Sequence, residues 1–250
     1  MDKTSMRYWY PRIKDMSIPQ PRTELIPNTD DDDITALLSD TEADTMSEME
    51  LRSHINIPLV ERTCENLGYP VFLRSDYTSH KHDWKRSCFV TCKEDIIPHI
   101  QNILEFSVLA NIFGGIPFTA IAVREYIPMA QIFTAFGRGM PVNPEWRFFI
   151  DNGQILCSHW YWTEPAIQFP SIRTWKSLMF KARNKSIEDG GNRKCETHAW
   201  AISNILPGKW SVDFCLGANG IWYLIDMAES FKSWHPEDCH NHKLIRQHPQ

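Results

Sequence analysis

The chain has 250 residues, 42% hydrophobic and 23% charged, which is ordinary for a globular protein and suits one large domain or two smaller ones. The formal net charge of −5 argues against broad nonspecific binding of nucleic acid. No apolar run approaches the ~20 residues that span a membrane, and no apolar signal region follows Met1, so we expect a cytoplasmic protein whose seven cysteines are reduced thiols.

The first part of the chain differs in composition from the rest, and we expect residues 1–51 to form an N-terminal arm with an acidic segment. Residues 1–22 are basic and aromatic, and Pro11 with two later prolines argues against a helix there. Residues 23–51 carry many Asp and Glu and no Lys or Arg. A block of like charge is commonly a solvated surface. The alternative is that it binds a basic protein partner.

Residues 52–128 combine helical and strand patterns, so we expect them to form a first, smaller lobe. Apolar residues recur at helical spacing over 52–67, where Gly68 is placed to end the helix, and over 95–113. The strands expected in this lobe are 69–74, 88–90 and 120–127.

Residues 129–234 are expected to form a second lobe with two hairpins. In the first, an Asn-Gly pair at 152–153 joins an aromatic strand to its partner. By the period of two in a strand, Arg147 lies on the same face as Glu145. Arg147 is therefore either half of a surface pair with Glu145 or a side chain that recognises phosphate or carboxylate.

The second hairpin places two carboxylates opposite each other. An Asn-Gly pair at 219–220 predicts a two-residue type I′ turn between strand-like runs. Counting outward from that turn puts Asp213 directly across from Asp226. Like charges at directly paired positions destabilise a sheet, and a divalent cation held by oxygen ligands is the commonest reason to keep them.

Residues 235–250 form a polar tail that is rich in histidine. Zinc ligands are present in it, but their spacing fits no standard finger, so a solvated tail is the expectation. The tail residues concerned are His235, Cys239, His240 and His242, with Cys88 and Cys92, or Cys195 and His198, as distant contributors. Cys157 with His159 offers the residue types of a thiol catalytic pair, which adjacent positions on one strand do not form.

These patterns together favour an α+β fold with largely antiparallel sheets. Charged residues gather on or beside the strands of this fold, and they are Arg74, Lys81, Arg124, Glu125, Glu145, Arg147, Asp213, Asp226 and Glu229. Cations neutralise phosphate oxygens and carboxylates hold a bridging metal. The set therefore indicates a polyphosphate ligand together with a divalent cation.

The order of the motifs resembles the ATP-grasp superfamily, most of all its small phage and bacterial clade with an arginine in the first strand. It is also similar to the cell-division-cycle ATP-grasp-like proteins that help to assemble a translation initiation factor. The segments that carry the resemblance are Val71–Ser75 with Lys81, Val123–Pro128, Glu145–Ile150, and Trp210–Asp213 with Tyr223–Asp226. The resemblance implies two lobes with a nucleotide cleft between them.

The resemblance also implies a role for each charged position. Arg74 and Lys81 would bind phosphates, the latter from a loop without the usual glycines, and Arg147 would contact the γ-phosphate or an acyl-phosphate intermediate. The hinge between lobes, whose main chain would pair with adenine, would be Glu125, Tyr126 and Ile127, and Arg124 and Glu145 complete the nucleotide-binding set. Asp213 and Asp226 would hold Mg²⁺, and Glu229 could replace the ligand that is missing because Ala228 stands where the family has Asn.

The expected function is that of an ATP- and Mg²⁺-dependent ligase that phosphorylates a carboxylate and lets an amine attack the acyl phosphate. Arg147 and Lys81 would be its catalytic residues. The alternative is a nucleotide-binding assembly factor without ligase turnover that docks a protein partner through residues 23–51. A polynucleotide-acting enzyme is a weaker third option, because the chain has no net basic character.

Overall fold

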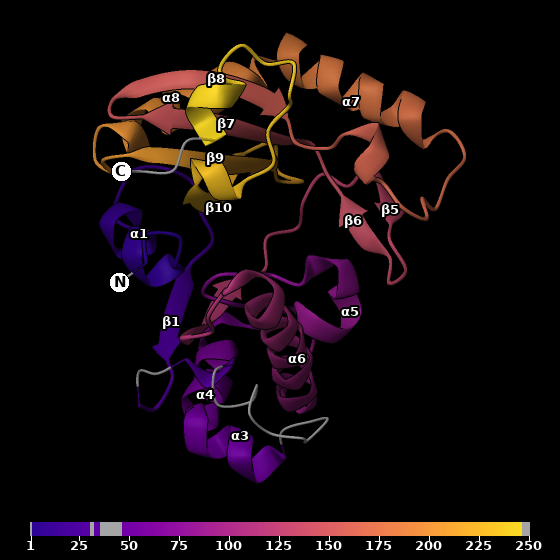
Figure 1. The fold of residues 1–250 in the computed structure, drawn as a ribbon. Helices are drawn as coiled ribbons and strands as arrows, with labels where there is room; N and C mark the ends of the chain where they lie inside the picture. The colour runs from indigo at the N-terminus through magenta and orange to yellow at the C-terminus, as the bar shows by residue number, and fades with distance from the viewer. Residues whose placement is uncertain (1, 31–32, 36–46, 247–250) are drawn as a thin grey trace. The chain divides into compact units, whose positions relative to one another are not determined.

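A computed structural model describes residues 2–30, 33–35 and 47–246 (Figure 1). The chain divides into two compact units. Unit 1 comprises Met1–Gln20, Pro128–Ala135 and Pro141–Gln250, and unit 2 comprises Pro21–Ile127 and Phe136–Met140. Both units combine helices with antiparallel strands, so the α+β prediction is confirmed.

Unit 2 is built on a four-stranded antiparallel sheet in the order β1-β4-β2-β3. Its strands are β1 (Thr23–Pro27), β2 (Val71–Ser75), β3 (Phe89–Val90) and β4 (Ala120–Glu125). Its helices are α3 (Glu48–His54), α4 (Ile57–Leu67), α5 (Trp84–Ser87) and α6 (Ile96–Gly114), with short 3₁₀ turns η1 (Lys81–Asp83) and η2 (Lys93–Asp95). Alternate residues of β2 and β4 join the buried core with α4 and α6, because successive side chains of a strand point to opposite faces.

Two of the helices follow the sequence expectations closely. The Asn56 side chain caps the start of α4, and Gly68 ends it with a φ of 85°, which a residue with a Cβ rarely adopts. The segment Lys93–Gly114, which contains α6, is long and apolar enough to cross a membrane by length and composition alone, contrary to our expectation that no such run exists. Ile96, Ile100 and Ile103 of α6 are fully buried in the core of unit 2, so we assign it as a core helix.

The N-terminal residues are divided between the two units. The helix α1 (Met6–Ile13) forms in unit 1 although Pro11 lies inside it, so the expectation of no helix was wrong. A Ser5 cap and a buried face that includes Trp9 stabilise this short helix despite the missing proline N–H. The start of the acidic segment is β1, which pairs with β4 over five residues. Residues 31–32 and 36–46 of that segment lie outside the described residues.

Unit 1 contains a second antiparallel sheet, in the order β10-β9-β7-β8. Its strands are β7 (Glu145–Asp151), β8 (Gln154–Trp160), β9 (Lys209–Leu216) and β10 (Trp222–Glu229), and β5 (Phe133–Ala135) and β6 (Met140–Val142) form a small separate ribbon. The remaining elements are α7 (Trp175–Glu188), α8 (Gly191–Ser203), α9 (His242–Arg246), η3 (Glu164–Ala166) and η4 (Ser230–Lys232).

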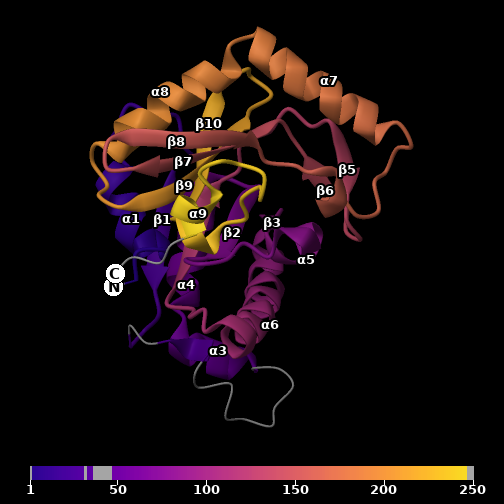
Figure 2. The ribbon, with the colours of Figure 1, turned by 45° about the horizontal axis from the view of Figure 1, so that its top comes forward.

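The two faces of this sheet differ in character. Helices α7 and α8 cover one face, as both views show (Figures 1 and 2). Trp146 and Phe214 belong to that apolar face: the Trp146 Nε1 donates to Ser186 Oγ of α7 at 3.0 Å, and the Phe214 ring contacts His198 of α8. The alternate residues of the same strands point to the opposite face, which carries the charged side chains.

Candidate functional site

Four polar side chains form one row across the sheet of unit 1. Asp226 of β10 pairs with Asp213 of β9, Asp213 pairs with Arg147 of β7, and Arg147 pairs with His159 of β8. Directly paired residues of antiparallel strands lie on the same face. The four side chains therefore share one face of the sheet, and the predicted pairing of the two aspartates is confirmed.

The β9–β10 hairpin reaches this pairing by an unexpected route. The predicted two-residue type I′ turn was wrong: Gly217 N–H bonds to Ile221 O at 2.7 Å, and Asn219 does not have the positive φ that a type I′ turn requires. The Asn219 side chain instead accepts from Ile221 N–H and donates to the Tyr223 hydroxyl, which fixes a wider loop. An irregularity between Leu224 and Asp226 then shifts the register by one residue and restores the pairing.

The β7–β8 hairpin has the expected turn. Asn152 and Gly153 have φ values of 42° and 84°, the two positive angles of a type I′ turn, and Asp151 pairs with Gln154 beside them. The local sequence was sufficient here because the turn geometry depends on these two residues alone. It places β7 and its arginine between β8 and β9.

Arg147 and Asp213 form a two-pronged ion pair. Arg147 Nε donates to Asp213 Oδ1 and Nη2 donates to Oδ2, both at 2.7 Å, and the two side chains are 14% and 6% exposed. Arg147 Nη1 donates to Trp234 O at 3.3 Å, and its Cζ lies 4.6 Å from the centre of the Tyr161 ring. Burial lowers the pKa of Arg147, but the Asp213 carboxylate raises it further, so the net direction is upward and the guanidinium stays charged. The surface pair with Glu145 is not formed, since Glu145 is itself buried.

The carboxylates of β10 lie on opposite faces. Asp226 shares the face of Asp213, and its Oδ1 accepts from Met227 N–H at 3.0 Å. Glu229 pairs with Trp210 on the other face, where it accepts from Thr4 Oγ1 and lies 3.7 Å from Lys232 Nζ. The structure thus brings Asp213 and Asp226 together and keeps Glu229 apart from them.

Unit 2 places two arginines on the sheet face opposite its core. Arg74 pairs with Ala122, and Arg124, two residues along β4, pairs with Phe72. Both arginines are buried, and their Nε atoms donate to Ser75 O and Thr23 Oγ1 respectively. Two buried cations at diagonal positions of one sheet face form a concentrated positive site.

Lys81, in η1, adds to the charge near Arg74. Burial raises the pKa of the Cys88 thiol to about 12, while Arg74 and Lys81 both act to lower it. The two cations therefore lie close enough to the same buried thiol to influence its ionisation. This agrees with the expectation that the η1 loop and β2 contribute to one cationic site.

The expected hinge residues end β4, where the chain passes from unit 2 into unit 1 after Ile127. Glu125 N–H already donates to Arg22 O at 2.8 Å, and the Glu125 carboxylate pairs with the Arg22 guanidinium at 3.1 Å. Tyr126 packs against Phe89 and Trp84, with ring centres 4.9 and 6.2 Å apart, and burial raises the pKa of its phenol. Tyr126 is thus part of an aromatic surface.

The loop before Lys81 provides a test of buried histidine chemistry. The His80 ring stacks on Phe106 at 4.2 Å and shares a hydrogen bond with Ser87 Oγ, and burial lowers its pKa. Because the unfolded chain then binds more protons below its ordinary pKa of about 6.5, the His80 contribution to stability is complete above that pH and is lost as the pH falls.

We therefore expect His80→Asn to reduce the slope of unfolding free energy against pH between about pH 6.5 and 5. Asn tolerates the left-handed backbone of this position, where φ is 34°. Urea titrations at several pH values measure the slope, with His240→Asn in the exposed tail as the matched control. Equal slopes in both variants would count against the assignment.

A pocket of about 340 Å³ opens beside β8 in unit 1, and sequence reasoning did not find it. Aromatic walls and a few charged groups line it, among them Trp146, Trp160, Trp162, Lys176 and Arg183. Trp160 and Trp162 were considered as base-stacking residues, but both are buried. The pocket depends on α7 lying beside the strand, which the sequence pattern alone does not reveal.

The comparisons with known proteins identify the class and then the family. The fold is of the ATP-grasp type. The chain belongs to an ATP-grasp domain family, the third family of its clade, whose model matches residues 66–247. No curated protein sequence matches the chain.

Solved structures with similar folds share little sequence with this chain. C-terminally truncated Cdc123 from Schizosaccharomyces pombe is 12% identical, with a TM-score of 0.55 over 90% of this chain and 82% of that chain. Another structure of Cdc123 from the same organism is 13% identical, with a TM-score of 0.52 over 90% and 83%. N5-carboxyaminoimidazole synthase from Aspergillus clavatus, in complex with ADP and 5-aminoimidazole ribonucleotide, is 11% identical, with a TM-score of 0.46 over 90% and 44%.

Proposed function

We propose that the protein binds ATP with Mg²⁺ and activates a carboxylate as an acyl phosphate, which an amine then attacks. The observation that carries this proposal is the row of Asp226, Asp213 and Arg147 on one sheet face. Membership of an ATP-grasp family supports the nucleotide. The chemistry requires positioning and charge stabilisation rather than a covalent bond to the protein.

Asp213 and Asp226 are the residues that would hold Mg²⁺. They fit the ion because two paired carboxylates supply the oxygen ligands that Mg²⁺ prefers, and the charge of Arg147 balances only one of these two carboxylates. Ala228 and its partner Ser211 offer no carboxylate further along the same face. We therefore assign one protein-bound ion rather than two. When bound, the ion would neutralise phosphate charge.

Arg147 would change partner during the reaction. In the structure it is bound to both oxygens of Asp213. When MgATP binds, the metal takes over the charge of Asp213, and the guanidinium becomes available to the transferred phosphoryl group, whose oxygens suit its planar fork. Lys81 would stabilise the same charge, with Arg74 and Arg124 on the remaining phosphates.

Adenine recognition is assigned to the residues that end β4. Because Glu125 N–H is used by Arg22 O, the main chain of Tyr126 and Ile127 is the better donor and acceptor for the adenine edge. The aromatic surface around Tyr126 would contact the base. Seven free cysteines support a reducing compartment, so we place this activity in the cytoplasm.

Trapping the intermediate tests the ligase proposal. Hydroxylamine attacks acyl phosphates, so incubation of the chain with MgATP, hydroxylamine and a panel of amino acids and peptides should give hydroxamates together with ADP. We expect ADP release to depend on the carboxylate and to disappear without Mg²⁺. ATP binding without carboxylate-dependent ADP release across the panel would contradict ligase chemistry and leave the second candidate.

That second candidate is a nucleotide-binding assembly factor, which the single-ion site at Ala228 favours. Deleting residues 23–51 would not test it cleanly, because the deletion removes β1 from the sheet of unit 2. Changing Asp40, Glu42, Asp44 and Glu48 to their amides removes the charge and keeps the strand. Loss of a co-purifying basic protein with unchanged ATP binding would support the factor.

A further inference from the structure

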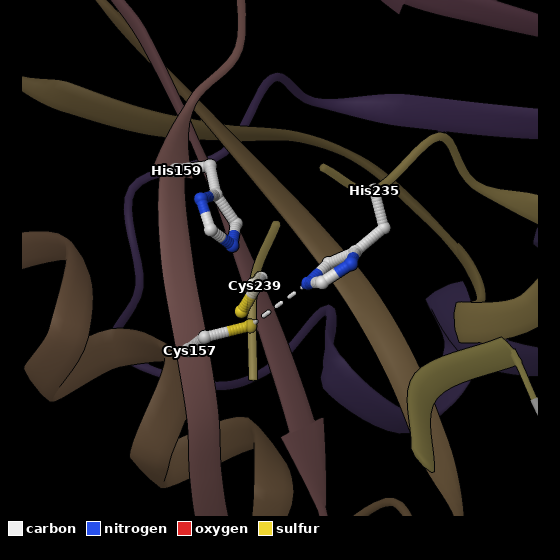
Figure 3. A group of neighbouring side chains, drawn as sticks. All are labelled: Cys157, His159, His235 and Cys239. Atoms are coloured by element: carbon white, nitrogen blue, oxygen red, sulfur yellow. Dashed lines mark hydrogen bonds between the residues drawn. The ribbon is translucent and has the colours of Figure 1, made fainter. Parts of the chain in front are cut away.

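A second cluster of chemically reactive side chains lies on the charged face of unit 1. Cys157 and His159 stand two residues apart on β8, and His235 and Cys239 lie in the segment between η4 and α9. One ligand atom of each residue lies within 4.8 Å of one in every other. Both imidazole rings and both sulfur atoms converge on one point (Figure 3).

The ligand types and distances suit a tetrahedral metal ion. Two thiols and two imidazoles form the Cys₂His₂ set of structural zinc sites, whereas Mg²⁺ and Ca²⁺ prefer oxygen. Zinc bonds of about 2.3 Å to sulfur and 2.0–2.1 Å to nitrogen separate neighbouring ligand atoms by roughly 3.3–3.8 Å in a tetrahedron. The Cys157 Sγ–His235 Nε2 distance of 3.3 Å is already close to that range.

Neighbouring groups hold the two imidazoles in place. The His235 ring is 3% exposed and packs edge-on against Phe149 and His159, with centres 4.7 and 4.9 Å apart. His159 Nε2 is buried and has no hydrogen-bond partner among the residues that the structure describes. A buried nitrogen without a partner is costly, and coordination to a metal would satisfy it.

The electrostatics of the cluster agree with this chemistry. Burial lowers the pKa of His235 to about 4 and also lowers that of His159, so both rings are neutral, which is the form that binds metals. Burial, together with Cys239, raises the pKa of the Cys157 thiol. A divalent cation at the centre would reverse that last effect and stabilise the thiolates.

Further contacts fix the segment that supplies the second pair of ligands. His235 Nδ1 lies 3.2 Å from His242 Nδ1, and Asn241 Nδ2 donates to Leu156 O of β8 at 2.6 Å. The residue before His235 is Trp234, whose carbonyl accepts from Arg147. A metal at this point would therefore join the C-terminal segment to β8 and also steady a contact of Arg147.

We propose that Cys157, His159, His235 and Cys239 bind one structural Zn²⁺ ion that fastens the C-terminal segment to the sheet of unit 1. Four protein ligands close the coordination shell, as in structural rather than catalytic zinc sites. The site is separate from the Asp213–Asp226 pair, although His159 belongs to the same row of the sheet.

The test measures metal directly, without ATP. The full chain, purified under reducing conditions from zinc-supplemented cells, should contain one zinc per chain by mass spectrometry of the elements. After removal of zinc with a chelator, titration with Co²⁺ should give the intense visible absorption of a tetrahedral thiolate site. The chelator should also lower the melting temperature.

Variants distinguish this site from adventitious binding. We expect Cys157→Ser and Cys239→Ser to lose the zinc and the cobalt bands, while Cys92→Ser in unit 2 keeps both. Absence of stoichiometric zinc with only a weak octahedral cobalt spectrum would overturn the proposal, as would zinc retained in both ligand variants. Recovery of a Cys157–Cys239 disulfide from protein alkylated at lysis would also overturn it. Should a variant fail to fold, the zinc content and cobalt spectrum of the unaltered chain still decide.

Discussion

Replacement of Asp226 with Asn should abolish Mg²⁺-dependent ATP binding. The amide keeps the size of the side chain but removes the negative charge beside Asp213, whose own charge Arg147 already balances. A direct ligand should matter at least as much as an outer-shell partner of a metal, whose loss costs about 10–100-fold in affinity. We therefore expect about a 100-fold or larger loss, measured by calorimetric titration of ATP with and without Mg²⁺.

Glu229→Gln is the matched control for this experiment. It makes the same chemical change three residues along β10, on the opposite face of the sheet. Its carboxylate serves Thr4 and Lys232, so MgATP affinity should stay at the level of the unaltered chain. Binding of ATP without Mg²⁺ should survive in both variants. Equal effects of the two substitutions would remove Asp226 from the metal site.

Replacement of Arg147 with Met should destabilise unit 1 severely. It would leave the Asp213 carboxylate buried without its cation and directly beside Asp226. Removing one partner of a buried ion pair costs about 3–5 kcal/mol, whereas replacing both partners with apolar residues is often nearly neutral. We expect Arg147→Met to lose stability in that range and the double variant Arg147→Met/Asp213→Leu to recover much of it.

Urea unfolding of the single and double variants measures this coupling. Arg22→Met is the matched control, because the Arg22–Glu125 pair has a guanidinium that is 62% exposed. An exposed pair of this kind is worth about 0–1 kcal/mol. If Arg147→Met costs no more than Arg22→Met, or if the single variants simply add in the double variant, the pair does not stabilise the sheet as we argue.

The sequence predicted elements whose geometry depends on neighbouring residues. The type I′ turn at Asn152-Gly153 and the end of α4 at Gly68 both follow from positive φ angles that those residues adopt readily. The pairing of Asp213 with Asp226 was also predicted. It holds because a wider loop and a later one-residue register shift compensate each other, and the sequence contained no sign of either change.

Other residues were misjudged because their partners are distant in sequence. Pro11 lies inside a helix, because packing of the buried face of α1 outweighs the lost hydrogen bond. Arg147 pairs with Asp213, 66 residues away, rather than with Glu145. Glu229 faces away from Asp226, since an odd separation along a regular strand changes the face.

By itself, the sequence determined the fold class, the strand and turn chemistry of unit 1 and the choice of ATP-grasp residues, because these depend on local periodicity and on short motifs. Only the tertiary structure decided which side chains meet. Cys157 and His159 were one motif in the sequence and His235 and Cys239 another, and the C-terminal segment brings them together across 78 residues. Contacts of that range depend on the order of strands in the sheet and on the packing of the returning chain, which no local pattern records.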